Sequence, residues 1–257
     1  MSIRRLAPAF AALRLRRGWP TLVVCLLALL AAPRPASAQW YLAAYLGGNY
    51  TIDSTVSIRV PTENLSVDFH NVQIAAQPNY PRRYYGWRIG KMFRGFKHLG
   101  LEFEHIHMKA LVDTSQSYDV TIGSGSILPA GGAQPMSNIV PEYQMTHGLN
   151  LLFVNLVMRR PLGASNRLAL TLRGGTGPMI PHAETTVLGK IKHDYDYAGF
   201  GAQAAAGLQI QLPYRLSIVT EYKFTYARPK IDLDEGTGWM PAATHHVVVG
   251  MSVGLTK

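Results

Sequence analysis

The chain has 257 residues and a formal charge of +10 at pH 7, and 47% of its residues are hydrophobic. The basic excess is concentrated near the N-terminus, because residues 1–38 hold six arginines and no acidic residue. Residues 39–257 carry 19 basic and 15 acidic residues, a formal charge of only +4, so the charge gives no reason to expect a nucleic-acid partner. The single cysteine, Cys25, also lies in 1–38, which leaves 39–257 without disulfide or thiol chemistry.

The first 38 residues are predicted to be a cleaved signal peptide. Basic residues precede a short apolar run at 22–32, and Ala36-Ser37-Ala38 follows as a small-x-small cleavage site. The apolar run has about half of the ~20 residues that a spanning helix needs. The sequence therefore predicts export, with 1–38 removed and 39–257 as the mature domain. General secretion is favoured, and the paired arginines leave the twin-arginine route open.

The mature sequence alternates apolar with small or polar residues, which is the period of a β-strand. Eight segments follow this pattern: 40–56, 83–92, 99–111, 144–159, 167–180, 197–212, 215–231 and 244–256. In 197–212, for example, Phe200 and Leu208 share one face and Gln203 and Gln209 share the other. We expect the apolar face of each strand to contact lipid and the small or polar face to point inward.

The connections between these segments alternate in length, with long ones at 57–82, 112–143, 181–196 and 232–243. Short periplasmic turns and longer outer loops are typical of outer-membrane barrels, and an all-β spanning chain has to close on itself. The sequence therefore predicts an all-β fold: an eight-stranded antiparallel transmembrane β-barrel in a bacterial outer membrane. A soluble β-sandwich or a lipocalin-like barrel is the alternative.

The two faces of the predicted wall carry different residues. Aromatic residues are expected in the interfacial girdles: Trp40, Tyr41, Tyr84, Tyr85, Trp87, Tyr222 and Tyr226. Charged residues are expected inside: Arg88, Glu102, Glu104, Arg173, Glu221 and Lys223. Because buried charges need partners, three acids and three bases predict a compensating ion network, although Glu104 and Glu221 are also candidates for acid–base or metal chemistry.

Histidines gather where the predicted strands meet the outer surface: His105, His107, His147, His182, His245 and His246. Histidine is the commonest metal ligand and titrates near neutrality, so this layer is the candidate site. The predicted catalytic set is His107, His182, His246, Glu184 and Glu221, and the three histidines of that set are the predicted metal ligands. Lys109 and Lys223 are predicted to bind an anionic substrate. The alternative is that these are ordinary interfacial histidines, since His105 and His245 have lipid-facing parity.

Six segments together resemble a known family: 101–109, 146–152, 174–177, 181–184, 221–226 and 244–246. They resemble the OmpA-like outer-membrane β-barrel superfamily and, within it, the alphaproteobacterial branch of lipid A oxidases. The resemblance implies oxygen-dependent oxidation of the proximal glucosamine of lipid A to aminogluconate, with release of hydrogen peroxide and use of a divalent metal ion. It also implies outer-membrane lipids, lipopolysaccharide and the barrel-assembly machinery as partners. The alternative is a non-catalytic structural or adhesion-type barrel; a lipid A deacylase is less favoured because no His-x-Ser pair ends a late strand.

Overall fold

The computed structural model describes residues 40–76, 84–94, 96, 98–124 and 132–255. The predicted signal peptide and its cysteine lie outside the described residues. None of the helices in these ranges is long and apolar enough to cross a membrane.

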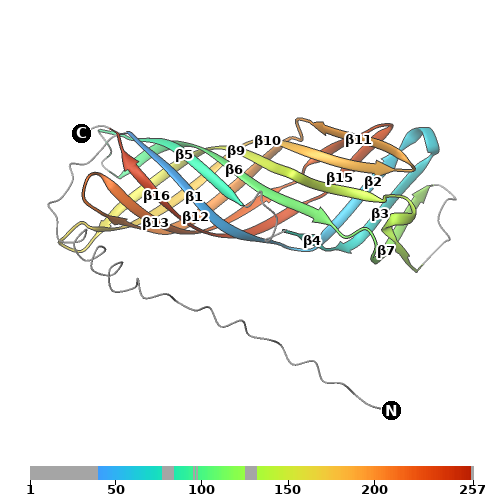
Figure 1. Cartoon of the computed structure of the whole chain (residues 1–257), viewed down its shortest axis with the longest axis horizontal. Helices are drawn as coiled ribbons and strands as arrows, with labels where there is room; N and C mark the ends of the chain where they lie inside the picture. Colours follow the sequence, from blue (N-terminus) through green and yellow to red (C-terminus); the bar gives the residue numbers. More distant parts are fainter. Residues whose placement is uncertain (1–39, 77–83, 95, 97, 125–131, 256–257) are drawn as a thin grey trace, which may run out of the picture.

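Eight antiparallel strands form a closed wall (Figure 1). They are β1 (Trp40–Thr51), β5 (Tyr85–Met92), β6 (Leu99–Val112), β9 (Glu142–Leu162), β10 (Leu168–Val187), β12 (Phe200–Gln211), β13 (Leu216–Ala227) and β16 (Ala242–Gly254). Each strand pairs with the next in that order, and β16 pairs back with β1, which closes the ring. The predicted eight-stranded antiparallel barrel is confirmed.

The connections at one end of the barrel are short turns, and those at the other end are long, as predicted. Most of the described residues in the long connections nevertheless form further strands rather than irregular loops. These are β2 (Ser54–Val60), β3 (Leu65–Val72), β4 (Ile74–Ala75), β7 (Ser117–Ser124), β8 (Ala133–Pro135), β11 (Lys190–Tyr195), β14 (Lys230–Leu233) and β15 (Gly236–Trp239), with the short 3-10 helices η1 (Pro61–Glu63) and η2 (Met136–Asn138). Six of the strands pair as a second sheet, β14-β15-β2-β3-β7-β8, beyond the barrel. This sheet lies at the end opposite the C-terminus (Figure 1).

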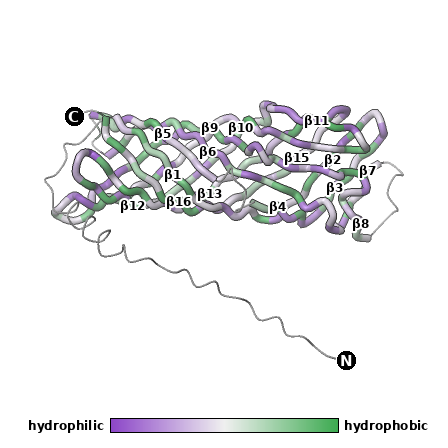
Figure 2. Tube along the Cα trace, in the orientation of Figure 1, coloured by the Kyte–Doolittle hydropathy of each residue, from purple (hydrophilic) through white to green (hydrophobic). Residues whose placement is uncertain are grey.

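The alternation of apolar and polar residues along the chain explains the strands of both sheets. Along the barrel strands, hydrophobic and hydrophilic residues follow one another (Figure 2). The same pattern continues in β2, where Val56, Ile58 and Val60 are all buried. Pro61 and the left-handed Asn64 then turn the chain back into β3, so a short strand pair replaces the expected loop.

The interior has two levels. Toward the short turns it is polar and charged, with Arg88, Glu104 and Lys223 fully buried. Toward the long connections it is apolar, and residues of the barrel wall and of the second sheet share one core: Val56, Ile58, Val67, Phe69, Ile106, Met108, Tyr143, Met145, Leu149, Leu151, Phe153, Met179 and Ile231. The second sheet therefore extends the barrel as a packed structure.

The outside of the wall carries an apolar belt. Its exposed members include Leu42, Leu46, Ile89, Leu101, Val154, Leu156, Leu172, Leu208, Val247, Val249 and Met251, together with the aromatic residues Trp40, Tyr85, Trp87, Tyr222 and Tyr226. The prediction of a girdle position is wrong for two residues, Tyr41 and Tyr84, which are buried. Tyr41 instead donates a hydrogen bond to Glu102 inside the barrel. An exposed apolar belt on a closed antiparallel wall is the surface that lipid covers.

Candidate functional site

The six charges predicted to face inward form one ion network. Arg88 Nε lies 2.8 Å from Glu104 Oε1, and Arg173 Nε lies 3.0 Å from Glu102 Oε1. Glu221 contacts both arginines, and Lys223 pairs with Glu104. The network has three positive and three negative groups, as the sequence predicts, so each buried charge has an opposite partner.

Neutral side chains complete this network. Tyr45 donates to Glu104 Oε1 at 2.6 Å, and Asn155 donates to Glu104 Oε2 at 2.9 Å. Two predicted site residues lie here, since Glu221 and Lys223 are both within the network and essentially inaccessible. Neither reaches the outer surface, so the predicted roles of Glu221 in catalysis and Lys223 in substrate binding are not supported by their positions.

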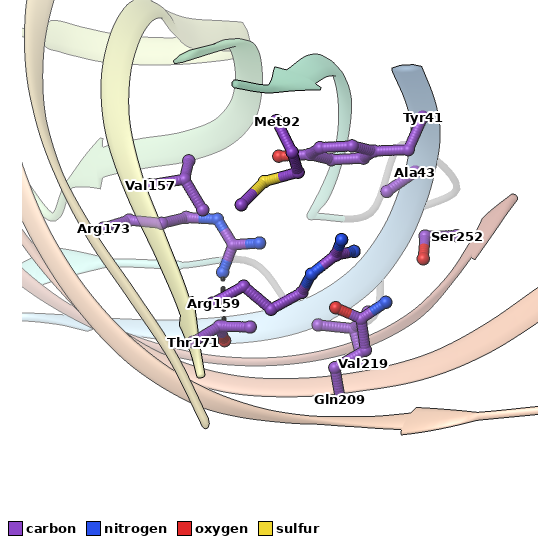
Figure 3. A pocket seen from close by; sticks show the side chains of 10 residues that line it. All are labelled: Tyr41, Ala43, Met92, Val157, Arg159, Thr171, Arg173, Gln209, Val219 and Ser252. Atoms are coloured by element: carbon purple, nitrogen blue, oxygen red, sulfur yellow. Dashed lines mark hydrogen bonds between the residues drawn. The ribbon is translucent and has the colours of Figure 1, made fainter. Parts of the chain in front are cut away.

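A small pocket lies inside the barrel near the short turns (Figure 3). Arg159 extends into it between Tyr41 and Gln209, and Arg173 extends into it beside Thr171. The space has a volume of about 10 Å³, which is room for about one water molecule. It is far too small for a sugar, so this pocket is not a site for lipid A.

The predicted histidine set divides between the two faces of the wall. His246 points inward, where its Nε2 lies 2.8 Å from the Thr225 hydroxyl and its ring packs on Tyr84. His107 has outward parity, and its ring stacks on Tyr85 with centroids 4.6 Å apart. His107 Nδ1 also lies 2.9 Å from Asn150 Oδ1. The structure thus does not bring His107, His182 and His246 together.

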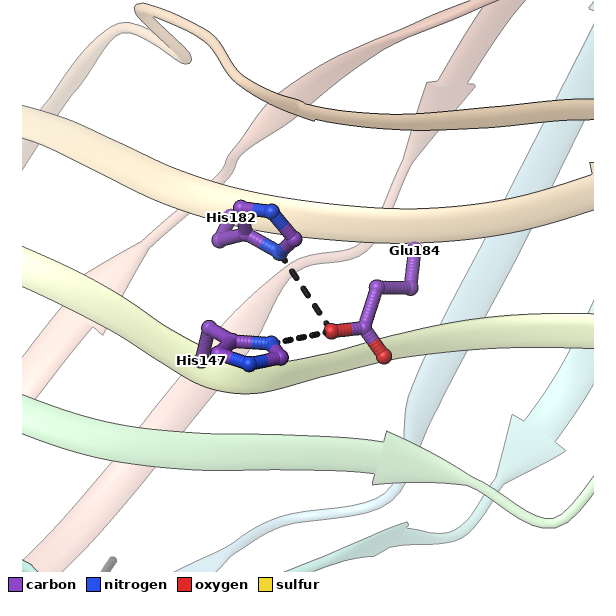
Figure 4. Close-up of side chains that lie close together, drawn as sticks. All are labelled: His147, His182 and Glu184. Carbon is purple, nitrogen blue, oxygen red and sulfur yellow. Dashed lines mark hydrogen bonds and ion pairs between the residues drawn. The ribbon is translucent and has the colours of Figure 1, made fainter.

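The structure does bring His182 and Glu184 together with His147 (Figure 4). His147 Nδ1 donates a hydrogen bond to Glu184 Oε1 at 2.5 Å, and His182 Nδ1 lies 3.3 Å from the same oxygen. Thr146 Oγ1 also donates to this oxygen, at 2.5 Å. The rings of Tyr195 and His182 pack edge to face, with centroids 4.5 Å apart. We call His147, His182 and Glu184 the outer triad.

A bulge in β9 creates the outer triad. The pairing of β9 shifts register against β6 between Met108 and Ala110, and against β10 between Pro181 and Glu184. Gly148, within the bulge, has φ +108°, and a Cβ at this position would collide with the His107 ring. A bulge re-aims side chains that regular pairing would fix, and here it places His147 beside β10.

The outer triad lies on the outer face of the wall, just beyond the apolar belt. On β10, Glu184 lies four residues beyond Ile180, which is exposed. Its register partner on the neighbouring strand β9 is Gln144. The exposed fraction of the side chain is 43% for His147, 18% for His182 and 10% for Glu184. The triad is therefore shielded on the protein side and open on the other.

The surroundings of Glu184 favour its ionised form. Its Oε1 accepts hydrogen bonds from Thr146 and His147, and the His182 imidazole lies beside the same oxygen, which are contacts that stabilise a carboxylate. Glu184 is therefore a carboxylate at neutral pH.

Lys109, the other predicted substrate-binding residue, lies on β6 at the register shift that faces the bulge. It is buried, with an exposed fraction of 4%. It therefore lies opposite the bulge of β9, but its ammonium group is not on the surface.

His147 is the member of the outer triad that the predicted catalytic set omits. The sequence Thr146-His147-Gly148 does contain a sign of the bulge. An isolated glycine within a strand pattern is typical of a β-bulge, and Gly148 directly follows His147. Sequence alone places His147 in the outer layer of histidines, but the register shift decides which neighbour it meets.

No protein-family model matches the chain, and no curated protein matches it either. Solved structures do match. OprG, an outer membrane protein of Pseudomonas aeruginosa, is 12% identical with a TM-score of 0.46, over 86% of this chain and 97% of OprG. The outer membrane protease OmpT of Escherichia coli is 8% identical with a TM-score of 0.45, over 86% and 99%. Neisserial surface protein A is 8% identical with a TM-score of 0.41, over 86% and 100%.

Likenesses this distant concern the fold alone and say nothing of activity. The architecture itself has three marks: a closed wall of eight antiparallel strands, an exposed apolar belt, and short turns at one end with long connections at the other. These are the properties of an outer-membrane protein, in which the short turns are periplasmic. The chain is an outer-membrane β-barrel.

Proposed function

We propose that this barrel is an enzyme that oxidises lipid A in the outer leaflet, with the outer triad as its reacting site. The supporting observation is a carboxylate between two imidazoles, on the outer face of the wall and just past the apolar belt. At this depth the neighbouring molecules are lipid headgroups, so a lipid rather than a soluble molecule is the natural substrate. The resemblance of the sequence to the lipid A oxidase branch supplies the reaction.

The proposed reaction is a two-electron oxidation by molecular oxygen. The anomeric carbon of the proximal glucosamine, as a free hemiacetal, loses its C–H hydrogen and its hydroxyl hydrogen. Two electrons and two protons pass to O₂, which gives hydrogen peroxide and a lactone, and water then opens the lactone to the aminogluconate. Lipid A gains one oxygen atom overall. Because a 1-phosphate would block the anomeric hydroxyl, the substrate has to be lipid A without that phosphate.

Residues of the outer triad have defined tasks in this proposal. The Glu184 carboxylate accepts the anomeric hydroxyl proton, because the hydrogen bonds from Thr146 and His147 favour its ionised form. The half-exposed His147 binds a sugar hydroxyl at the open side of the site. Tyr195 and Thr146 hold His182 and Glu184 in place. The inward-facing Lys223, Glu221 and His246 take no part.

The test is mass spectrometry of lipid A lacking the 1-phosphate, incubated in air with barrel extracted from membranes. We expect a gain of one oxygen and an equal amount of hydrogen peroxide. Glu184→Gln should abolish both, whereas Glu142→Gln, a matched change at a carboxylate paired with His193, should not. Wild-type barrel that is folded but leaves lipid A unchanged, with and without added divalent metals, would contradict the proposal.

A non-catalytic barrel that supports the envelope is the second candidate. The observation in its favour is the complete pairing of the inward charges, which accounts for them without chemistry. A deletion strain that is sensitive to detergents, and that the Glu184→Gln barrel rescues as well as wild type, would favour this candidate. Failure of the folded variant to rescue would favour the enzyme.

A further inference from the structure

We infer that the outer triad binds a divalent transition-metal ion through His147, His182 and Glu184. The inference deepens the proposed function, on whose site it rests, by naming the ion that the site holds. It is drawn from the geometry of three side chains. No other group of this kind occurs in the part of the chain that the structure describes.

The spacing of the triad suits a metal ion. One ligand atom from each residue lies within 4.8 Å of the other two. Metal–ligand bonds of about 2.1 Å at tetrahedral or octahedral angles place neighbouring ligand atoms about 3.0–3.4 Å apart. His182 Nδ1 and Glu184 Oε1, at 3.3 Å, already have this separation. His147 is hydrogen-bonded to Glu184 at 2.5 Å and needs to move by only about 0.5–1 Å to make room for the ion.

A buried nitrogen without a hydrogen bond points to the same conclusion. Among the described residues, His182 Nδ1 has no hydrogen-bond partner although the atom is buried. A buried polar atom without a hydrogen bond costs free energy. Its nearest charged neighbour is Glu184 Oε1, so a cation between the two would satisfy both atoms.

The triad also has the supporting contacts that metal ligands need. Thr146 donates a hydrogen bond to Glu184, and the Tyr195 ring fixes the orientation of His182. Such contacts hold ligands in position before the ion arrives. His193 and Glu142, 3.2 Å apart on the same outer surface, form a pair without a second imidazole and are therefore the natural comparison.

The donor set selects the kind of ion. Two imidazole nitrogens and one carboxylate oxygen suit Zn²⁺, Fe²⁺, Mn²⁺ or Co²⁺, whereas Mg²⁺ and Ca²⁺ prefer oxygen ligands alone. Three protein ligands leave coordination positions open, and the exposed side of His147 directs them to the outer surface. An ion there is accessible to a lipid headgroup.

The experiment is calorimetric titration of Zn²⁺ and of Mn²⁺ into barrel extracted from membranes and freed of lipopolysaccharide, whose phosphates would bind cations themselves. The protein used in the titration should carry no polyhistidine tag, because such a tag binds Zn²⁺ itself. We expect one ion per barrel and no comparable binding of Ca²⁺ or Mg²⁺. His182→Gln and Glu184→Gln should each lower the affinity by roughly tenfold or more.

Two matched variants control for loss of general surface binding. His245→Gln changes an outer-face histidine that is hydrogen-bonded to Tyr222, and Glu142→Gln changes the acid of the comparison pair. Both should bind the ion as wild type does. Equal loss in all four variants, unchanged affinity in the triad variants, or absence of binding to wild type would each overturn the inference.

Parallel assays separate this inference from the proposed function. A barrel that binds one ion through the triad but leaves lipid A unchanged would retain the metal site and refute the oxidase. A barrel that binds no ion in the titration but oxidises lipid A would retain the oxidase and refute the metal site. Heat-dependent mobility on gels checks that each variant is folded.

Discussion

His147 Nδ1 lies 2.5 Å from Glu184 Oε1, although the two residues are 37 positions apart in the chain. The pair joins β9 to β10 on the outer face of the wall, where the bulge of β9 interrupts regular pairing. The contact is therefore a product of strand register, and it provides the starting geometry of the outer triad.

Gly148→Ala is predicted to disrupt the bulge. Gly148 has φ +108°, and a methyl group there would collide with the His107 ring. We expect a loss of stability of about 1–3 kcal/mol and a weaker metal site, because His147 would no longer face Glu184. Urea unfolding followed by tryptophan fluorescence measures the first effect, and zinc titration measures the second.

Gly189→Ala is the control for this change. Gly189 also has a positive φ, +78°, but no atom lies within 4 Å of its absent Cβ. This variant should show backbone strain without a collision and should leave zinc affinity unchanged. If it weakens zinc binding as much as Gly148→Ala does, the bulge is not what positions the triad.

Much of the fold is predictable because alternation is a local property. In β12 and β13 the pattern identifies the outward and inward residues correctly, and Glu221 and Lys223 are buried as expected. The girdle prediction for Tyr41 and Tyr84 relied on residue type and neglected alternation. Tyr41 follows the outward Trp40, and Tyr84 precedes the outward Tyr85, so both face inward, where Tyr41 donates a hydrogen bond to Glu102.

Glu104→Ala is predicted to be strongly destabilising. Glu104 accepts hydrogen bonds from Arg88, Tyr45 and Asn155, so its removal leaves buried cations short of a partner. Breaking a buried pair from one side costs about 3–5 kcal/mol. Urea unfolding should reveal this loss.

The matched surface change is Asp68→Asn, which breaks the partly exposed pair between Asp68 and Arg59. Such pairs contribute less than about 1 kcal/mol. Equal losses in the two variants would show that the inner network does not stabilise the barrel more than a surface pair does.

Local separation of two outer hairpins, β10-β11 and β14-β15, is predicted to become slightly more frequent in acid, because a partly exposed ion pair between them weakens. Lys190 pairs with Glu235, and hydrogen bonds from Lys190 and Thr62 hold the pKa of Glu235 below its ordinary value of 4.5. The stabilisation is therefore complete above about pH 4.5 and disappears as the pH falls through the lowered pKa. The hydrogen bond to Glu235 raises the pKa of Lys190, so at the alkaline end the pair persists until the pH passes that raised value.

Hydrogen exchange at Leu188 and Gly189, the turn beside Lys190, reports this separation. Exchange in wild type should accelerate on acidification below pH 4.5, relative to the intrinsic rate. Glu235→Gln should exchange rapidly at both pH values. An acid response that persists in this variant would assign the effect to another group.

The candidate site was only partly predictable. The sequence places His182 and Glu184 two residues apart on one strand, which fixes their common face. Their partner could not be chosen this way, because His107, His147 and His246 all lie near the outer end. Side-chain direction separates them: His246 points into the barrel, and His107 is covered by Tyr85.

This difference predicts opposite behaviour of two single substitutions. His246→Gln should leave zinc affinity and lipid A oxidation unchanged, because the side chain faces Thr225 inside the barrel. His147→Gln should lower both. Zinc titration and hydrogen peroxide release, measured on the same folded preparations, check the pair. Loss of activity with His246→Gln alone would place the chemistry inside the wall.

The most direct test is the mass of lipid A lacking the 1-phosphate, after incubation in air with the wild-type barrel or with Glu184→Gln. We expect a gain of one oxygen atom with wild type and no change with the variant. Unchanged lipid A with folded, metal-loaded wild type, or an equal gain with Glu184→Gln, would contradict it.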